Sequence, residues 1–214
     1  MIKNKLIVFD YDGVIADSLP LWMNAFETGG IMNDIPYRLD KNKLDRIDYI
    51  SIKDIIKDAG LEEDERTPSY VSDINNVFKN SLDHVKFFKG INKLIEKLHL
   101  AGNTVCINTL SDTDIVRSKL VYEHILSFVS DIAGADMKGS KSEKTISFIK
   151  KFSFSPSDTF IIGDSTGDII EGKKAGVITI AVSYGWQNEK KLLSQKPDYM
   201  CSNVAELEKL FKNL

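Results

Sequence analysis

Residues 6–18 read Leu-Ile-Val-Phe-Asp-Tyr-Asp-Gly-Val-Ile-Ala-Asp-Ser, and they give the strongest indication of the fold in this sequence. Its first four residues form an unbroken apolar run, which is typical of a strand buried on both faces of a parallel sheet. Two acids, Asp10 and Asp12, follow the run directly and precede Gly13. Ligands bind at the carboxyl ends of strands in open parallel sheets, so both carboxylates are candidates for a functional site. Taken alone, the motif is equally compatible with a solvated turn.

Further apolar runs occur along the chain, at residues 104–107, 159–162 and 177–182, with a weaker one at 132–133. Helical patterns lie between them. Apolar residues recur at i, i+3, i+4 and i+7 over 91–98, and at helical spacing again over 146–152. Strands that alternate with helices predict an α/β fold with a doubly wound, Rossmann-like parallel sheet.

Residues 17–86 contain no comparable strand run. Apolar residues at helical spacing predict helices around 22–26, 47–56 and 71–78, and glycines at 29–30 and 60 predict breaks between helices. We therefore expect a helical insertion at 17–86, after the first strand. Residues 1–16 and 87–214 are expected to form the sheet-based core.

A second acidic cluster follows another apolar run, in the sequence Phe-Ile-Ile-Gly-Asp-Ser-Thr-Gly-Asp at 160–168. Asp164 ends this strand, and Asp168 is expected on the first turn of the next helix. Together with Asp10 and Asp12, these acids would place four carboxylates at one edge of the sheet, where they repel each other unless a cation is present. Oxygen ligands of this kind select Mg²⁺, so the pattern predicts a magnesium site.

The apolar run at 104–107 leads to Asn108 and Thr109 and then to an expected helix start at 112–114. A hydroxyl group at a strand end can donate a hydrogen bond to a phosphate oxygen. Threonine at such a point is more often a helix cap, and the residues alone leave both interpretations open.

Together these motifs resemble those of the haloacid dehalogenase superfamily of phosphohydrolases, in the branch that includes phosphoglycolate phosphatase and beta-phosphoglucomutase. The family pattern D-x-D-G-x-x-x-D-S corresponds to residues 10–18, its strand-terminal Thr or Ser to Thr109, and its G-D-x-x-x-D to residues 163–168. The family also has a lysine at a helix start. Lys141, in Lys-Ser-Glu, fits a family variant of that motif better than Lys138 or Lys144 does.

The resemblance implies a role for each motif. Asp10 would be the nucleophile that forms an aspartyl-phosphate, and Asp12 would be the general acid and base. Mg²⁺ would be held by Asp10, the main-chain carbonyl of Asp12 and Asp164, with Asp168 beside it or as an occasional ligand. The phosphate group would be bound by Thr109, Leu110 and Lys141.

The resemblance also implies that residues 17–86 form a helical cap that closes over the site and sets substrate choice. Several polar side chains of this segment could contact a substrate or could equally be surface residues: Asn24, Tyr37, Arg38, Lys41 and Arg46.

The composition and charge indicate which classes of binding partner and which cellular location to expect. A net charge of −3 gives no basic excess, so nucleic acid is not an expected partner. No apolar run approaches the ~20 residues of a membrane span, and no signal sequence is seen at the N-terminus, so we expect a cytoplasmic protein.

Cys106 and Cys201 are expected to be buried, reduced thiols. The expected partner is a small phosphorylated metabolite, and the chain is expected to be a monomer or homodimer.

The favoured function is a magnesium-dependent phosphatase that hydrolyses a small phosphomonoester. A sugar phosphomutase would carry the same four motifs, and a non-catalytic regulator that binds magnesium or phosphate could share the fold. A dehalogenase is disfavoured because it needs no acid at Asp12. A nucleotide-dependent oxidoreductase is disfavoured because no G-x-G-x-x-G follows any strand.

Overall fold

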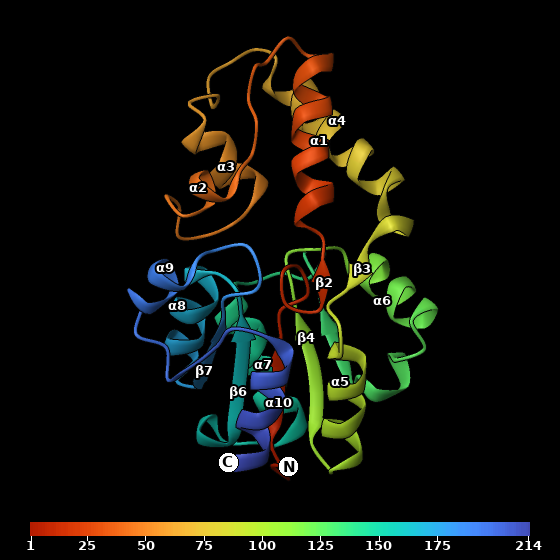
Figure 1. The fold of residues 1–214 in the computed structure, drawn as a ribbon, viewed down its shortest axis with the longest axis vertical. Coiled ribbons are helices and arrows are strands. Elements are labelled where there is room, and N and C mark those ends of the chain that lie inside the picture. The colour runs from red at the N-terminus through yellow and green to blue at the C-terminus, as the bar shows by residue number, and fades with distance from the viewer.

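The computed structural model describes all 214 residues, and a six-stranded sheet lies at its centre (Figure 1). The strands stand in the order β5-β4-β1-β6-β7-β8, and every neighbouring pair is parallel. Their bounds are β1 Leu6–Phe9, β4 Thr104–Asn108, β5 Asp131–Ala133, β6 Thr159–Gly163, β7 Ile178–Val182 and β8 Tyr199–Cys201. The predicted α/β fold is confirmed. Within this sheet only the short edge strand β8 had no sequence prediction, because three residues, two of them only partly buried, give little apolar signal.

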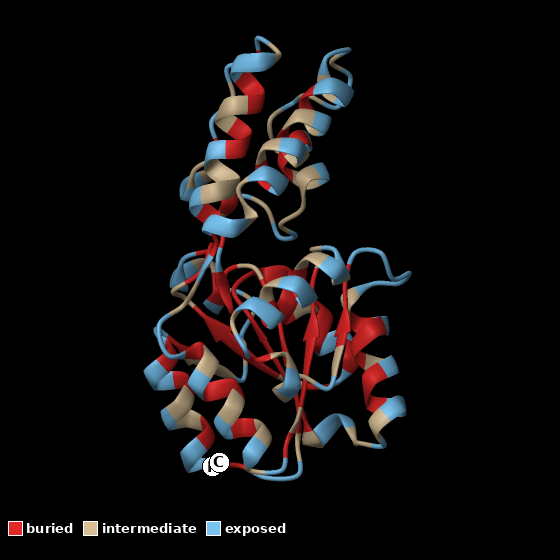
Figure 2. Ribbon diagram, turned by 90° about the vertical axis from the view of Figure 1, so that its right-hand side faces the viewer, coloured by how far each residue is buried: buried red, intermediate tan, exposed pale blue.

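Strand β1 is buried on both faces, as its apolar run predicts. Ile7 and Phe9 pack into the larger apolar cluster on one face of the sheet, and Leu6 and Val8 pack into a second cluster on the other. Successive side chains of a strand point to opposite faces, so a strand covered on both sides must be apolar throughout. Figure 2 shows the buried strands in the middle of this layer, with helices whose outer sides are exposed.

Helices cover both faces of the sheet. Those contributing to the larger cluster are α5 Ile91–Leu100, α6 Thr113–Tyr122 and α10 Val204–Asn213, and those on the other face are α7 Lys141–Phe152, α8 Thr166–Ala175 and α9 Glu189–Leu193. Single 3₁₀ turns lie at Leu82–His84, Leu126–Phe128 and Pro156–Asp158. None of the helices combines the length and apolar character that a membrane-spanning segment needs.

Residues 17–86 lie beyond the carboxyl ends of the strands (Figure 1). They contain α1 Leu19–Met32, α2 Lys41–Leu44, α3 Ile52–Asp58 and α4 Thr67–Asn80, which share an apolar cluster separate from those of the sheet. The chain enters and leaves this region through an antiparallel pair, β2 Ala16–Asp17 and β3 Lys86–Phe87. The division at 17 and 86 remains our prediction for the domain boundaries.

Two expectations for this region were wrong. Gly29 and Gly30 do not end a helix but lie inside α1, because α1 packs closely on its neighbours there. A Cβ at Gly29 would lie 3.1 Å from the side chain of Ile74, and one at Gly30 would lie 2.5 Å from the carbonyl oxygen of Ile35. The helix expected over 47–56 begins only at Ile52, after Ser51 caps it.

Both cysteines are buried and unbonded, Cys106 in β4 and Cys201 in β8. Burial raises the pKa of both thiols, to about 11 for Cys201. The expectation of buried, reduced thiols is confirmed.

Candidate active site

The loop after β1 brings Asp10 and Asp12 to the carboxyl edge of the sheet. The amide of Asp10 donates to the carbonyl of Ile162 in β6 at 2.8 Å, which continues the pairing of the two strands. Gly13 then turns the chain with a φ of +75°, and its amide donates to the carbonyl of Ala16. This turn directs the main chain back towards α1 and leaves room for Asp164.

Replacing Gly13 by Ala is expected to destabilise the protein by more than ~3 kcal/mol. The backbone conformation is left-handed, which costs about 1–2 kcal/mol for a non-glycine residue. In addition, the new Cβ would lie 1.9 Å from Oδ2 of Asp164. Gly102 is a matched control, because its φ is +89° but the nearest atom to a new Cβ is 3.8 Å away. Urea unfolding should show a clearly larger loss for Gly13→Ala than for Gly102→Ala, and equal losses would contradict this account.

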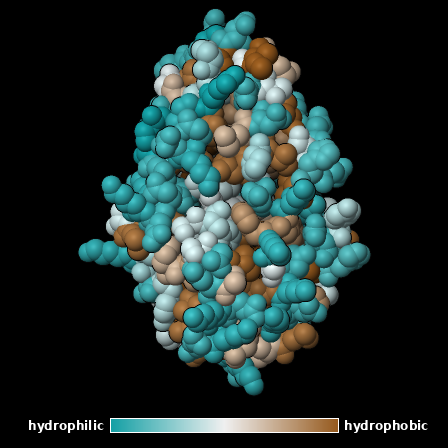
Figure 3. Space-filling model, viewed as in Figure 1, coloured by the Kyte–Doolittle hydropathy of each residue, from teal (hydrophilic) through white to brown (hydrophobic).

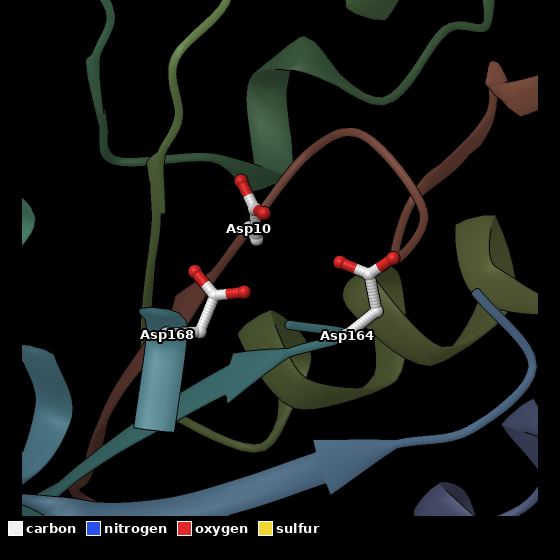
Figure 4. Close-up of side chains that lie close together, drawn as sticks. All are labelled: Asp10, Asp164 and Asp168. Atoms are coloured by element: carbon white, nitrogen blue, oxygen red, sulfur yellow. The ribbon is translucent and has the colours of Figure 1, made fainter. Parts of the chain in front are cut away.

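Three carboxylates converge at this edge. Asp10, Asp164 and Asp168 each offer an oxygen within 4.8 Å of the others, and Figure 4 shows the three side chains close together. Burial, together with the neighbouring acids, raises the pKa of Asp10 to about 7 and the pKa of Asp164 well above its usual value. Three buried carboxylates this close are unfavourable without nearby positive charge.

Lys141 supplies part of that charge. Its Nζ lies 2.9 Å from Oδ2 of Asp10 and 2.6 Å from Oδ1 of Asp168. Burial alone would lower the pKa of Lys141, but the two carboxylates raise it above its usual value. The lysine reaches this position because it is the first residue of α7, where Ser140 and Glu143 form a capping box.

Backbone and hydroxyl donors hold the two acids that come from β6 and α8. The amide of Trp186 donates to Oδ2 of Asp164 at 2.7 Å. The hydroxyl of Ser165 donates to Oδ2 of Asp168 at 2.6 Å, which leaves Oδ1 to Lys141. These contacts fix the direction of both carboxylates.

The cluster suits a divalent cation. Three carboxylates against one ammonium group leave two uncompensated negative charges in a buried site, and all the available donors are oxygen atoms. This donor set fits Mg²⁺, with Asp10 and Asp164 as the side chains that would hold it and Asp168 beside them.

Asp12 lies outside this cluster. Its Oδ1 accepts a hydrogen bond from the hydroxyl of Ser18 at 2.5 Å, and its Oδ2 accepts one from the hydroxyl of Ser111 at 2.6 Å. Burial raises the pKa of Asp12, and the two hydroxyl groups oppose that rise. The side chain of Asp12 is thus not a cation ligand here, so any contribution to metal binding would come from its main-chain carbonyl. Ser111 was missed in the sequence, although it stands only two residues after Thr109.

Thr109 and Leu110 directly follow the last residue of β4 and line the same cavity as the acids. Thr109 is fully buried, and its Oγ1 accepts a hydrogen bond from the amide of Ser111 at 3.0 Å. Leu110 is half exposed and lines the cavity described below together with Thr109.

Of the three lysines considered, only Lys141 reaches the acids. The Nζ of Lys144 donates instead to the carbonyl of Gly134 at 2.7 Å, and Lys138 is exposed. Lys141 is the first residue of α7 and reaches the acids, whereas Lys144, three residues further along the same helix, reaches the loop after β5.

Glu171, on α8, accepts hydrogen bonds from the amide of Ser142 at 3.0 Å and from Nζ of Lys174 at 2.7 Å. Burial would raise its pKa, but these donors outweigh burial and lower the pKa from 4.5 to about 2. Its carboxylate therefore joins the start of α7, which carries Lys141, to α8.

The contribution of Glu171 to stability should depend on pH. Because its folded pKa is depressed, its contribution of about 3 kcal/mol is fully present above pH 4.5 and is lost as the pH falls towards 2. Glu171→Gln should therefore lower the free energy of unfolding at pH 7 and much less at pH 3. Urea titrations at both pH values measure this, with the exposed Glu63→Gln as control. A deficit that is the same at both pH values would contradict the prediction.

Residues 44–49 are tied to the core beside this site. Gln187 is buried, and its Nε2 donates to the carbonyls of Leu44 at 2.8 Å and Ile47 at 2.7 Å, while its Oε1 accepts from the amide of Thr166. The side chain of Trp186 packs into the apolar cluster of α1–α4. No local sequence pattern indicates the role of Gln187, because the carbonyls to which it donates lie about 140 residues away along the chain.

A cavity of about 710 Å³ lies over the acids, between the core and helices α1, α3 and α4. It is lined by every predicted site residue: Asp10, Asp12, Thr109, Leu110, Lys141, Asp164 and Asp168. None of the five polar residues considered in the insertion lines it. Lys41, for example, donates to the carbonyl of Gly185 at 2.8 Å, so it links the insertion to the core.

The model of the haloacid dehalogenase-like hydrolase family matches residues 7–182, and the chain therefore belongs to this family. The predicted family and the predicted class, a hydrolase, are confirmed. A similar protein is the phosphoglycolate phosphatase of Vibrio vulnificus strain CMCP6, which is 24% identical over 95% of this chain and 94% of its own length.

Solved structures show the same fold. A haloacid dehalogenase-like hydrolase from Streptococcus pneumoniae superposes with a TM-score of 0.85, at 22% identity, over 97% of this chain and 98% of its own. A protein described as a putative beta-phosphoglucomutase from Thermotoga maritima superposes with a TM-score of 0.75, at 17% identity, over 98% and 99%. At these identities the likeness concerns the fold alone.

Proposed function

We propose that this chain is a magnesium-dependent phosphatase that hydrolyses a small phosphomonoester through a phosphate bound covalently to Asp10. The family match and the relatives named phosphatases identify the enzyme class as a phosphoric monoester hydrolase. One observation carries the finer proposal. Asp10 lies in contact with Lys141 and within a cluster of acids, while Asp12, two residues away, is held apart by two hydroxyl groups.

The two aspartates have different surroundings and therefore suit different steps. Asp10 attacks phosphorus, so that a bond from its carboxylate oxygen to phosphorus forms while the bond to the ester oxygen breaks. Asp12, whose pKa is raised by burial, gives its proton to the departing alcohol. It then takes a proton from the water that hydrolyses the aspartyl-phosphate, and inorganic phosphate leaves.

Charge neutralisation completes the site, because phosphoryl transfer depends mainly on positioning and electrostatic stabilisation. Lys141 lies beside Asp10, where its ammonium group would contact a transferring oxygen, and Thr109 and Leu110 line the same cavity. When bound at Asp10 and Asp164, Mg²⁺ would neutralise charge on the phosphoryl group.

A panel of phosphomonoesters tests the proposal: p-nitrophenyl phosphate, phosphoglycolate, sugar phosphates and nucleoside monophosphates, each with Mg²⁺ and with excess chelator. We expect release of inorganic phosphate with Mg²⁺ and its loss with chelator. Absence of turnover for every ester would point to a non-catalytic binding protein. Isomerisation of a sugar phosphate with little phosphate release would identify a phosphomutase. The cytoplasmic location and the oligomeric state remain predictions from the sequence.

A further inference from the structure

The cavity over the acids has two chemically different parts. Its floor comes from the core and is polar, with the acids, Lys141 and the hydroxyl groups described above. Its upper wall comes from residues 17–86 and is mostly apolar, being built by Trp22, Phe26, Ile50, Ile52, Ile55 and Phe78. A phosphate group held on the floor would therefore direct the rest of its ester towards this apolar wall.

The wall contains a stacked aromatic pair. The rings of Trp22 and Phe78 lie 3.8 Å apart with an interplanar angle of 16°, and Phe26 lies 6.5 Å from Trp22. Phe26 and Phe78 are also buried members of the apolar cluster of α1–α4. Because that cluster fixes both side chains, the wall is preformed, as is usual for cavities that bind organic molecules.

The wall offers little to a second anionic group. The only charged side chains it contributes are Lys53 and Lys79, which are both exposed, and its other polar side chains are Tyr49, Ser51 and Asn75. Lys141 on the floor is already paired with Asp10 and Asp168. The carboxylate of a short acid such as phosphoglycolate would therefore face mostly isoleucine and aromatic side chains, with only the two exposed lysines as cations, which is unfavourable.

The size of the cavity argues in the same direction. Cavities of about 300–1,000 Å³ accommodate drug-sized ligands, and 710 Å³ falls within that range. A two-carbon acid phosphate would leave most of the apolar wall uncovered, whereas a ring system would cover it.

We propose that the substrate is a phosphomonoester whose leaving group carries a flat, largely apolar ring, such as a nucleobase or a fused aromatic ring, and not a short carboxylic acid. This inference rests on the proposed phosphatase activity and adds the chemistry of the leaving group. The ring would lie against Trp22, Phe78 and Ile52, above the phosphate group.

A graded series of esters tests this. We would measure kcat/KM with Mg²⁺ for ethyl phosphate, benzyl phosphate, 2-naphthylmethyl phosphate and phosphoglycolate. Each buried CH₂ group contributes a factor of about 4, so the naphthylmethyl ester should exceed the ethyl ester by at least about 50-fold, with benzyl phosphate between them. Phosphoglycolate should rank at or below ethyl phosphate. A kcat/KM for phosphoglycolate above that of the naphthylmethyl ester would overturn the inference.

Two variants and one control variant test whether the apolar wall causes the preference for ring-containing esters. Phe78→Ala should reduce kcat/KM at least about 10-fold more for the naphthylmethyl ester than for the ethyl ester. Val71→Ala is the control, because Val71 packs against the same apolar cluster but does not line the cavity. It should leave the ratio between the two esters unchanged, and an equal change of this ratio in both variants would count against the inference. Ile52→Arg should raise kcat/KM for phosphoglycolate at least about 10-fold by placing a cation within the apolar part of the wall, and it tests the inference even if Phe78→Ala folds poorly.

The outcomes separate this inference from the proposed function. If p-nitrophenyl phosphate and all other esters are inert, the phosphatase proposal fails. If p-nitrophenyl phosphate is hydrolysed but the ester series shows no preference for rings, only the substrate inference fails. Where rings are preferred, nucleoside 5′-monophosphates and flavin mononucleotide then distinguish a nucleobase from a fused-ring cofactor as the source of the ring.

Discussion

Asp10→Asn is expected to lower kcat/KM for p-nitrophenyl phosphate by at least about 10³-fold with Mg²⁺ present. An amide is a far weaker nucleophile than a carboxylate, so the aspartyl-phosphate could not form. The fold should survive. Asp10 is a buried carboxylate among other acids, and its replacement by a neutral group of the same shape relieves repulsion while Lys141 keeps its contact with Asp168. Thermal unfolding without metal should therefore change by only a few degrees.

The control for this variant is Asp114→Asn, on the exposed surface of α6 and outside every ion pair of the structure. It should keep the activity of the unmodified protein. Retained turnover in Asp10→Asn, with a normal thermal transition, would remove Asp10 from the role of nucleophile. Loss of activity together with loss of the thermal transition would indicate a structural role for Asp10 instead.

Lys141→Ala should produce the second large effect, a fall of about 10²-fold or more in kcat/KM. Its Nζ is the only cation of the protein in contact with Asp10 and Asp168, so its removal leaves two buried carboxylates without a positive charge beside them. The transferring phosphoryl oxygens would also lose a positive charge beside them. We would measure steady-state kinetics at saturating Mg²⁺ and, separately, thermal unfolding without metal.

Lys144→Ala is the matched control, since it removes a lysine from the same helix, three residues away. Lys144 is bound to the carbonyl of Gly134 and does not reach the acids, so this variant should lose some stability but little activity. Equal losses of activity in the two variants would show that the effect comes from damage to α7. The proposed role of Lys141 in binding the phosphate group would then be wrong.

The sheet could be predicted because local patterns determine it. The apolar runs at 6–9, 104–107, 159–162 and 177–182, in which threonine is the only polar residue, each became a strand with partners on both sides. A strand buried on both faces must be apolar at every position, so the signal is present in the residues themselves. Where burial is partial, as at β8 and between residues 44 and 51, the pattern weakens and the predicted bounds were incomplete or wrong.

The positions of the chemical groups followed from the same patterns. Acids that end neighbouring parallel strands must meet at one edge, and the spacing from Asp164 to Asp168 places the second acid on the first turn of α8. The structure brings Lys141 to these acids, in agreement with its place at a helix start. The roles of Asp10, Asp12, Thr109, Leu110 and Lys141 in catalysis and phosphate binding remain proposals, for which the experiments above are designed.

The sequence by itself therefore determined the α/β core, the edge where the acids gather and the family to which the chain belongs. Tertiary structure alone decided that Asp12 turns away from Asp10 and Asp164 to the hydroxyl groups of Ser18 and Ser111. It also decided that Gln187 ties the insertion to the core and that Trp22 and Phe78 line the cavity. These outcomes differ because the apolar patterns of strands and the caps of helices are local in the chain, whereas three of these contacts join residues far apart in it. They are Asp12 with Ser111, Gln187 with the carbonyls of Leu44 and Ile47, and Trp22 with Phe78.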